Sequence, residues 1–264
     1  MNNLKNNIIS DINTFDKEAS IYKILFQDRT TALLKYIVEK ISIDKYERVN
    51  YRLPSILIAG QDGKQIIIRA FSNSLCCKFE HIQGKHLGMG GCCGSLYRDS
   101  DSETVYFIGS ADKLNATSVT TLHNFLTHGY VKFKNPISGE EITVSAENKL
   151  FVFSVRDPAK LCPDLHKAVD YHCYLNKYNI EQMEILVEFR LKWCGVDFDK
   201  EVPAIIVRNG AGSISHCIRL LSVCFLVMRG NGKTKMTVKD VETGIALSHP
   251  QKGIVVPSAD DIPF

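Results

Sequence analysis

The sequence has no apolar run long enough for a membrane-spanning helix and no large excess of one charge. A transmembrane helix needs about 18 or more consecutive apolar residues, and charged residues interrupt the apolar segments well before that length. Lysine and arginine number 32 and aspartate and glutamate 29, a net charge of +3. This composition predicts no membrane insertion, and so small a charge does not by itself indicate a nucleic-acid partner.

The N-terminal stretch lacks the continuous apolar core of a secretory signal peptide before Asp11. We therefore expect a cytoplasmic protein, in which the nine cysteines stay reduced. Hydrophobic residues make up 45% and charged residues 23% of the chain, which is typical of a globular protein with a real core. A length of 264 residues fits one two-part domain or two small ones.

One cluster of cysteines and histidines invites a metal interpretation: Cys76, Cys77, His81, His86, Cys92 and Cys93. Adjacent cysteines are poor zinc chelators, because zinc sites usually space their ligands two to four residues apart. Small apolar residues of a packed core are the favoured interpretation. We predict no bound metal and no cofactor.

Hydrophobic periodicity predicts an α/β part followed by a helical part. Strands are expected at 55–59, 77–82, 105–108, 129–134, 141–144 and 150–154. Helices are expected at 17–40, 63–75, 115–126, 180–194, 204–208, 213–229 and 237–247. The predicted organisation is an α/β domain over 1–174, a helical domain over 175–249 and an extended tail over 250–264.

The segment Leu57–Ile68 is predicted to be an apolar strand, a glycine turn and a helix start, the arrangement of a phosphate-binding loop. Such a loop needs G-x-x-x-x-G-K-[ST], because its backbone N–H groups and lysine hold phosphates and its hydroxyl holds Mg²⁺. Here Gly63 and Lys64 are followed by Gln65, which has no hydroxyl, and Ile58 stands where the first glycine belongs. The loop after Gly60 is also shorter.

A second apolar strand, Thr104–Ile108, ends in Gly109 and Ser110. An ATPase with this order of elements places two acids there, for the metal and the attacking water. Two altered motifs in the right order predict an ATPase scaffold without its chemistry.

The order of elements resembles the AAA+ ATPases, and most closely the RuvB family of Holliday-junction branch-migration motors. Phe107–Asn115 is similar to the family's Walker B segment F-I-D-E-I-H-R-L-N, and Phe26–Asp28 to its Gly-Gln-Glu-like turn. A hairpin around Pro136–Gly139 and the segment Gly210–Ile214 fall where the family has a hairpin and its G-T-P-R-I turn. The resemblance implies a parallel sheet of the AAA+ P-loop type flanked by helices, followed by a small helical lid.

The same resemblance implies a changed nucleotide site. Ser213 stands at the position of the sensor 2 arginine, and 163–168 contains no arginine where the family has its arginine finger. Ser154, near sensor 1, is still polar. We therefore predict no catalytic residue and a degenerate nucleotide site at Gly60, Gly63, Lys64, Gly109, Ser110, Ser154 and Ser213. The chain ends at Phe264, so no counterpart of the family's winged-helix DNA-binding domain is expected.

Three functions fit these residues. A scaffold without chemistry favours a structural or adaptor subunit of a larger intracellular protein assembly, of open oligomeric state. Lys64 at a helix start could instead bind nucleotide without hydrolysis. The third alternative is DNA binding through Lys132, Lys134, Lys149, Arg156 and Lys160, although nearby acids dilute this charge.

The tail after the lid offers apolar residues that could order on a partner or pack on the lid itself. The candidate interaction residues are Ile254, Val255, Val256, Ile262 and Phe264. A further G-K-T occurs at 232–234, but it follows a predicted helix rather than a strand. We interpret it as a helix–helix turn.

Overall fold

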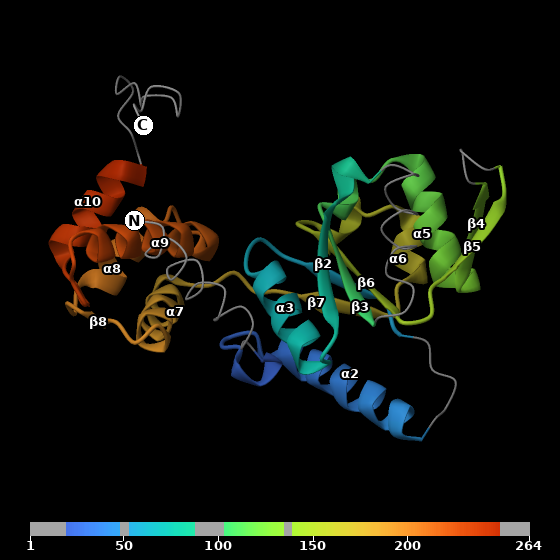
Figure 1. The fold of residues 1–264 in the computed structure, drawn as a ribbon, viewed down its shortest axis with the longest axis horizontal. Helices are drawn as coiled ribbons and strands as arrows, with labels where there is room; N and C mark the ends of the chain where they lie inside the picture. Colours follow the sequence, from blue (N-terminus) through green and yellow to red (C-terminus); the bar gives the residue numbers. More distant parts are fainter. Residues whose placement is uncertain (1–19, 48–52, 88–102, 135–138, 249–264) are drawn as a thin grey trace. The chain divides into compact units, whose positions relative to one another are not determined.

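The computed structural model describes residues 20–47, 53–87, 103–134 and 139–248. They form two compact units, an α/β unit ending at Lys177 and a helical unit beginning at Tyr178 (Figure 1). In these ranges no helix is both long and apolar enough to cross a lipid bilayer. The proposed tail residues 254–264, and Cys92 and Cys93 of the candidate metal cluster, lie outside the described residues.

The α/β unit is built on a five-stranded parallel sheet with strand order β2-β3-β6-β1-β7. The strands are β1 (Ile56–Ala59), β2 (Lys78–Gln83), β3 (Thr104–Gly109), β6 (Lys149–Val155) and β7 (Tyr171–Tyr174). Since parallel strands need long crossovers, helices connect most of them and cover both faces of the sheet. The predicted α/β class and the parallel sheet are confirmed.

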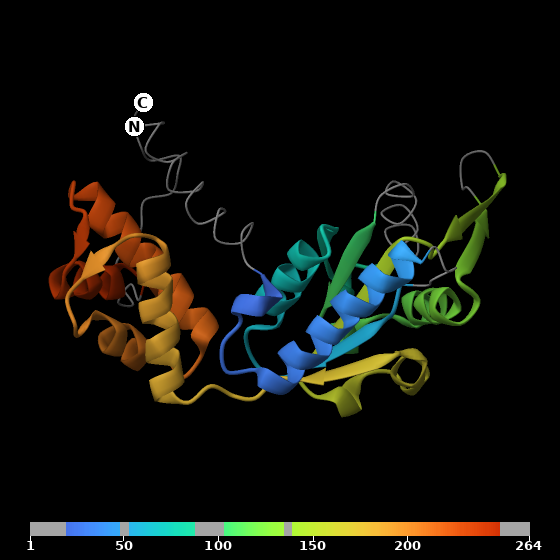
Figure 2. The same ribbon diagram turned by 90° about the horizontal axis from the view of Figure 1, so that it is seen from below.

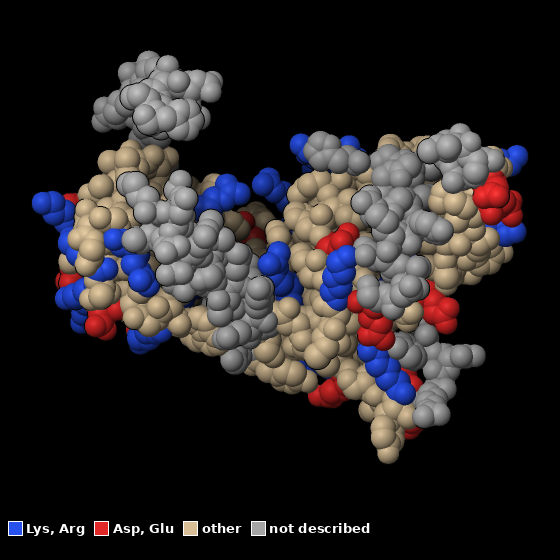
Figure 3. Space-filling model, in the orientation of Figure 1, with Lys and Arg blue, Asp and Glu red and all other residues tan. Residues whose placement is uncertain are grey.

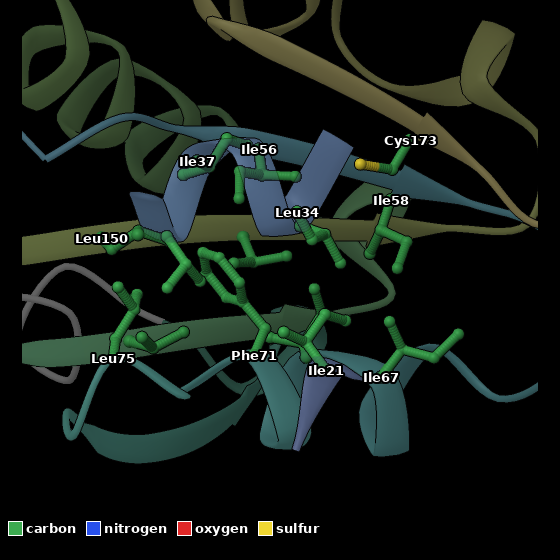
Figure 4. Packing of buried hydrophobic residues seen from close by; sticks show 14 of the residues in the cluster. Ile21, Leu34, Ile37, Ile56, Ile58, Ile67, Phe71, Leu75, Leu150 and Cys173 are labelled. Carbon is green, nitrogen blue, oxygen red and sulfur yellow. The ribbon is translucent and has the colours of Figure 1, made fainter. Parts of the chain in front are cut away.

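Helices cover the two faces in pairs, as the two ribbon views agree (Figures 1 and 2). One face carries α2 (Asp28–Tyr46) and α3 (Lys64–Ser74), and the other carries α5 (Ala116–His128) and α6 (Pro163–Ala168). Alternation along β1 decides which residue enters which core: Ile56 and Ile58 face α2 and α3, whereas Leu57 and Ala59 face α5. Figure 4 shows the first of these cores, where Phe71 of α3 and Leu34 of α2 approach Ile56 and Ile58.

The first helix begins later than the sequence predicts, at Asp28 rather than near residue 17. Phe26 has φ of 63°, a left-handed conformation that a helix does not contain, so the chain turns there. Gln27 is buried, and its side chain donates to the backbone carbonyl of Asn176 and accepts from the N–H of Asn176, both at 3.0 Å. This pairing fixes the start of α2 against the chain that follows β7.

The hairpin is formed by β4 (Tyr130–Lys134) and β5 (Glu141–Ser145), which pair antiparallel as predicted. Strand β7 was not predicted, because the sequence has little strand pattern after Pro163. Its four residues show no strong apolar alternation, and parallel pairing with β1 alone makes them a strand. Helix α6 in the adjoining segment was not predicted either, and Leu165 is fully buried in it.

Within residues 178–248, the helical unit has four helices around one core, as predicted. They are α7 (Ile180–Trp193), α8 (Val202–Asn209), α9 (Ile214–Gly230) and α10 (Val238–Ser248). Two short segments, β8 (Asp197–Phe198) and β9 (Lys235–Met236), pair in parallel between them. Residues 231–234 form the turn after α9, so the G-K-T at 232–234 belongs to a turn between helices.

Candidate nucleotide-binding site

Register brings most of the sequence-predicted site residues to one edge of the sheet. Ser154 of β6 lies between Ile58 of β1 and Gly109 of β3, as direct partners in adjacent strands. Gly60 and Gly63 follow β1, and Ser110 follows β3, so all of them leave the sheet at its carboxyl edge. In open parallel sheets this edge is where ligands bind.

The loop between β1 and α3 is short and closely held. Gly60 has φ of 136° and Gly63 has φ of 83°, conformations that favour glycine. A Cβ atom added to Gly60 would lie 2.9 Å from Cβ of Leu175, so a side chain there would collide with the chain beyond β7. The N–H of Gly60 also donates to the carbonyl of Val155 at 3.3 Å. The loop is therefore fixed from both neighbouring strands.

Lys64, the first residue of α3, folds back onto this loop. Its ammonium donates to the carbonyl of Gly60 and, at 3.2 Å, to the carbonyl of Gln61. A phosphate-binding lysine presents its ammonium to the ligand, whereas this one already binds neutral oxygens of its own loop. The start of α3 has no side-chain cap, because Gly63 occupies the N-cap position, so the first N–H groups still favour an anion.

Three charged residues that the sequence analysis did not include in the site act on Lys64. Burial lowers the pKa of Lys64, and Arg156 lowers it further, while Asp62 and Asp112 oppose the shift. Asp112 lies in the 3-10 helix η3 (Ala111–Lys113) after β3, and Arg156 directly follows β6. Their position just beyond the ends of the strands is the sequence feature that could have identified them. The site thus has acids, but neither stands at the end of β3 itself.

The end of β3 is filled by side chains of the neighbouring strand. A Cβ atom on Gly109 would lie 2.8 Å from Nε2 of His81 and 3.4 Å from the amide atoms of Gln83. Gln83 and His81 contact each other at 3.0 Å through their side-chain nitrogens, and the His81 ring packs edge-on against Phe107. Burial, with a smaller effect of Arg69, lowers the pKa of His81. A longer residue at 109 would therefore meet the ends of these two exposed side chains, which would have to move aside to admit it.

The next residue, Ser110, is constrained as well. It has φ of 54°, a left-handed conformation that is uncommon outside glycine. A Cβ atom on Gly84, in the 3-10 helix η2 (Gly84–His86) after β2, would lie 2.6 Å from the carbonyl oxygen of Ser110. The turns after β2 and β3 are therefore packed backbone against backbone, a contact that no sequence pattern indicates.

Ser213 and the expected arginine-finger segment are each described within their own unit. Ser213 belongs to the helical unit, where it caps α9 by accepting from the N–H of His216 at 3.4 Å. In the expected arginine-finger segment, Leu165 is a core residue and His166 packs edge-on against His172, with ring centroids 4.6 Å apart. The sensor 2 and arginine-finger assignments remain predictions.

The cysteine–histidine cluster is dispersed where it is described. Cys76 is exposed, whereas Cys77 lies against Glu103, and burial followed by the Glu103 charge raises the pKa of its thiol to about 12. His81 belongs to the β3 contact above. Among the described residues, no group of three histidines, cysteines or acids is arranged to hold a metal.

The basic residues considered for DNA binding are also spread. Lys149 is 2% exposed and belongs to the interior rather than to a surface. Lys132 pairs with Glu141 across the hairpin at 2.9 Å. Lys134, Arg156 and Lys160 remain exposed, but they come from separate elements. The sequence expectation of a five-charge region is wrong for Lys149, because strand β6 carries that residue inward.

The parallel sheet, the strand–loop–helix after β1 and the following helical unit together define the AAA+ fold. Solved structures of Thermotoga maritima RuvB have the same fold. The Holliday junction branch migration motor aligns at 14% identity over 88% of this chain and 73% of its own, with a TM-score of 0.66. Two of its variants align at 14% identity over 87% and 90% of this chain and 72% and 74% of theirs, with TM-scores of 0.69 and 0.67. Neither a protein-family model nor a curated protein matches the sequence.

Proposed function

We propose that this chain is a non-hydrolysing AAA+-type subunit that serves as a structural or adaptor component of a larger protein assembly. The observation that carries the proposal is the end of β3, where Gly109 and Ser110 stand in place of two acids and the side chains of His81 and Gln83 lie beside Gly109. Hydrolysis of ATP in this arrangement requires an acid that holds Mg²⁺ and another that orients water. Gly109 and Ser110 supply neither.

The loop after β1 supports the proposal independently. Lys64 binds Gly60 and Gln61, and Gln65 replaces the hydroxyl residue that would bind Mg²⁺. Metal and cationic clamps are worth several kcal/mol each for transition-state charge. With these groups replaced, the surface of the fold is what remains to carry a function.

Turnover of Mg²⁺–ATP by the full chain tests this proposal. We expect the phosphate release rate to equal that of a heat-inactivated sample and to be the same for Lys64→Ala and for the surface control Lys40→Ala. A rate above background that Lys64→Ala abolishes and Lys40→Ala preserves would refute it.

A nucleotide-binding switch without hydrolysis is the second candidate, and one observation favours it. The uncapped start of α3 and the Lys64 ammonium provide positive potential at the sheet edge. Calorimetric titration with ATP and ADP separates the two: the adaptor proposal expects no heat at millimolar ligand, whereas a micromolar dissociation constant supports the switch.

DNA binding is the third candidate, and it takes its support from the fold shared with a branch migration motor. Binding to duplex or four-way-junction DNA would weaken steeply as salt rises, because each neutralised phosphate releases counterions. Tight DNA binding at physiological salt, without a stable protein complex in native lysates, would favour this candidate over the adaptor.

A further inference from the structure

Two histidines from different elements of the α/β unit are in ring contact. His166 lies in α6 and His172 in β7, and their rings pack edge-on with centroids 4.6 Å apart. His172 is the register partner of Leu57, so its side chain lies on the face of the sheet that α5 and α6 cover. Both imidazoles are half-buried, and we call these two residues the histidine pair. Neither of them takes part in the proposed function.

The charge that acts on His172 is that of its partner in the pair. Burial, followed by the charge of His166, lowers the pKa of His172, and a hydrogen bond with the backbone of His166 partly opposes this shift. The hydroxyl of Tyr174 lies 3.5 Å from Nδ1 of His172. Asp170 is the carboxylate nearest to His172 along the chain, and it already accepts from the N–H and the hydroxyl of Ser55, both at 2.8 Å.

Other ionisable side chains come from the elements around the histidine pair. Strand β1 consists of four apolar residues. The remaining elements contribute Asp164 and Lys167 of α6, His123 and His128 of α5, Tyr171 and Cys173 of β7, and Asp28 and Arg29 at the start of α2. On the face of the α/β unit seen in Figure 3, acidic and basic side chains are interspersed. Because salt screens exposed and more distant charges, the ring contact dominates the electrostatics of the pair.

Strand β7 connects the histidine pair to the loop after β1. It is a four-residue strand at one end of the sheet, paired with β1, and short edge elements open at lower free energy than a central core. Leu175 follows it directly and donates its N–H to the carbonyl of Ala59 at 2.8 Å. The Cβ of Leu175 is also the atom that a side chain at Gly60 would meet. His172 is therefore three residues from a contact that fixes the Gly60 loop.

We propose that the histidine pair is a pH-sensitive contact, which holds α6 against β7 at neutral pH and loosens β7, with Leu175 and the Gly60 loop, when both rings are protonated. Two imidazolium rings in contact repel each other, and burial weakens the solvation that would compensate for it. The inference goes beyond the proposed function, because it requires neither nucleotide nor a partner protein.

The direction of the pH dependence follows from the surroundings of His172. Its pKa lies below the ordinary histidine value of about 6.5, so the opened form takes up a proton more readily than the closed form. The stability of the closed contact is therefore complete above about pH 6.5 and is lost as the pH falls below that value.

Hydrogen exchange of the full chain, resolved by NMR at pH 7.5 and pH 5.5 and corrected for the intrinsic rate at each pH, tests the proposal. The N–H groups of Tyr171 and Leu175 donate to Ser55 and Ala59, and we expect their protection to fall at least about fivefold at the lower pH. The amides of β6, in the centre of the sheet, are the internal reference and should change less than about twofold.

Two variants remove the charge of His166. His166→Phe keeps an aromatic ring at the contact, and His166→Gln keeps a polar side chain if the phenyl ring is not accommodated. In both, the protection of Tyr171 and Leu175 should differ by less than about twofold between the two pH values, and the NMR titration midpoint of His172 should rise. The control His128→Gln, at an exposed histidine of α5, should behave like the wild type.

Four results would count against the proposal. Protection of β7 that stays constant in the wild type would overturn it. So would a loss of protection that persists in both variants, a loss of equal size in β6, or a His172 midpoint that neither variant raises.

Discussion

Each of the two units contains a charged side chain that is at least partly buried, and the hydrogen-bond partners of these two groups differ. Asp240 of the helical unit is 1% exposed, and its carboxylate accepts from Lys233 at 2.9 Å and from Thr237 at both the N–H and the hydroxyl. Lys64 of the α/β unit is half-buried, and its ammonium donates to carbonyls of its own loop, while the charges of Asp62 and Asp112 act on it from nearby. Asp240 has a lysine as a direct hydrogen-bond partner, whereas the hydrogen bonds of Lys64 go to neutral oxygens.

Asp240 binds groups from different elements of its unit, whereas Lys64 binds groups within its own loop. The partners of Asp240 join the turn after α9 to the start of α10, so the carboxylate connects two helices. The partners of Lys64 lie three and four residues before it, so its bonds connect nothing beyond the loop. A buried charge is tolerated when it is paired and hydrogen-bonded, and Asp240 meets both conditions.

The largest expected effect is that of removing the Asp240 carboxylate. Asp240→Ala leaves Lys233 and Thr237 without their acceptor, and we expect a loss of about 2–3 kcal/mol in the free energy of unfolding. Urea denaturation followed by circular dichroism measures it. The exposed Asp197→Ala, in the same unit, should stay within about 0.5 kcal/mol of the wild type. If the two variants lose equal stability, the hydrogen bonds of the Asp240 carboxylate do not stabilise the helical unit.

A smaller loss of stability is expected at the carboxyl edge of the sheet, from a longer side chain at position 109. Gly109→Asp places a side chain against the end of the exposed His81 side chain, which can move aside, so we expect a loss of at most about 1 kcal/mol. Truncating the neighbour in the double variant Gly109→Asp, His81→Ala should recover part of that loss, which a double-mutant cycle measures. An additive cycle would show that His81 does not occupy the space.

The pH dependence of the helical unit is a further expected effect of the same carboxylate. Burial alone would raise the pKa of Asp240, but the bonds from Lys233, Thr237 and Asn231 outweigh it and lower the pKa to about 2. Because the folded pKa lies below the unfolded value near 4, unfolding takes up a proton at low pH. The stability due to this carboxylate is therefore complete above about pH 4 and is lost as pH falls toward 2.

Unfolding titrations between pH 2 and 6 measure that dependence. Asp240→Asn removes the titrating group, so its stability should fall less than that of the wild type over pH 4 to 2. Parallel slopes in the two proteins would assign the acid sensitivity to other carboxylates.

Most elements of the fold were predictable, because each has a local pattern. The buried strands β1, β3 and β6 are continuous apolar runs, and α9 shows helical periodicity over its full length. Strand β7 was not predictable, since only its pairing with β1 makes Tyr171–Tyr174 extended. The predicted start of α2 was wrong for a similar reason. The helix begins after Gln27, whose side chain binds Asn176, 149 residues away.

The position of the candidate site in the fold was predictable, but the contacts of its side chains were not. The spacing of Gly60, Lys64 and Gly109 placed them at strand ends, and the register of the sheet brings those ends together. Nothing in the sequence indicated that His81 and Gln83 fill the space beside Gly109, because they come from a neighbouring strand. Which way Lys64 turns was equally hidden, since a lysine at a helix start can face a ligand or its own loop.

The sequence by itself determined the order of elements, the two-part division into strands with helices and then helices, and the residues missing from the nucleotide motifs. These depend on local periodicity and on residue identity, which a linear chain displays directly. The tertiary structure alone decided what replaced the missing groups: His81 beside Gly109, the loop carbonyls around Lys64, and Asn231, Lys233 and Thr237 around Asp240. Contacts between strands and across turns depend on register and packing, and the same side chains would serve other roles in another register.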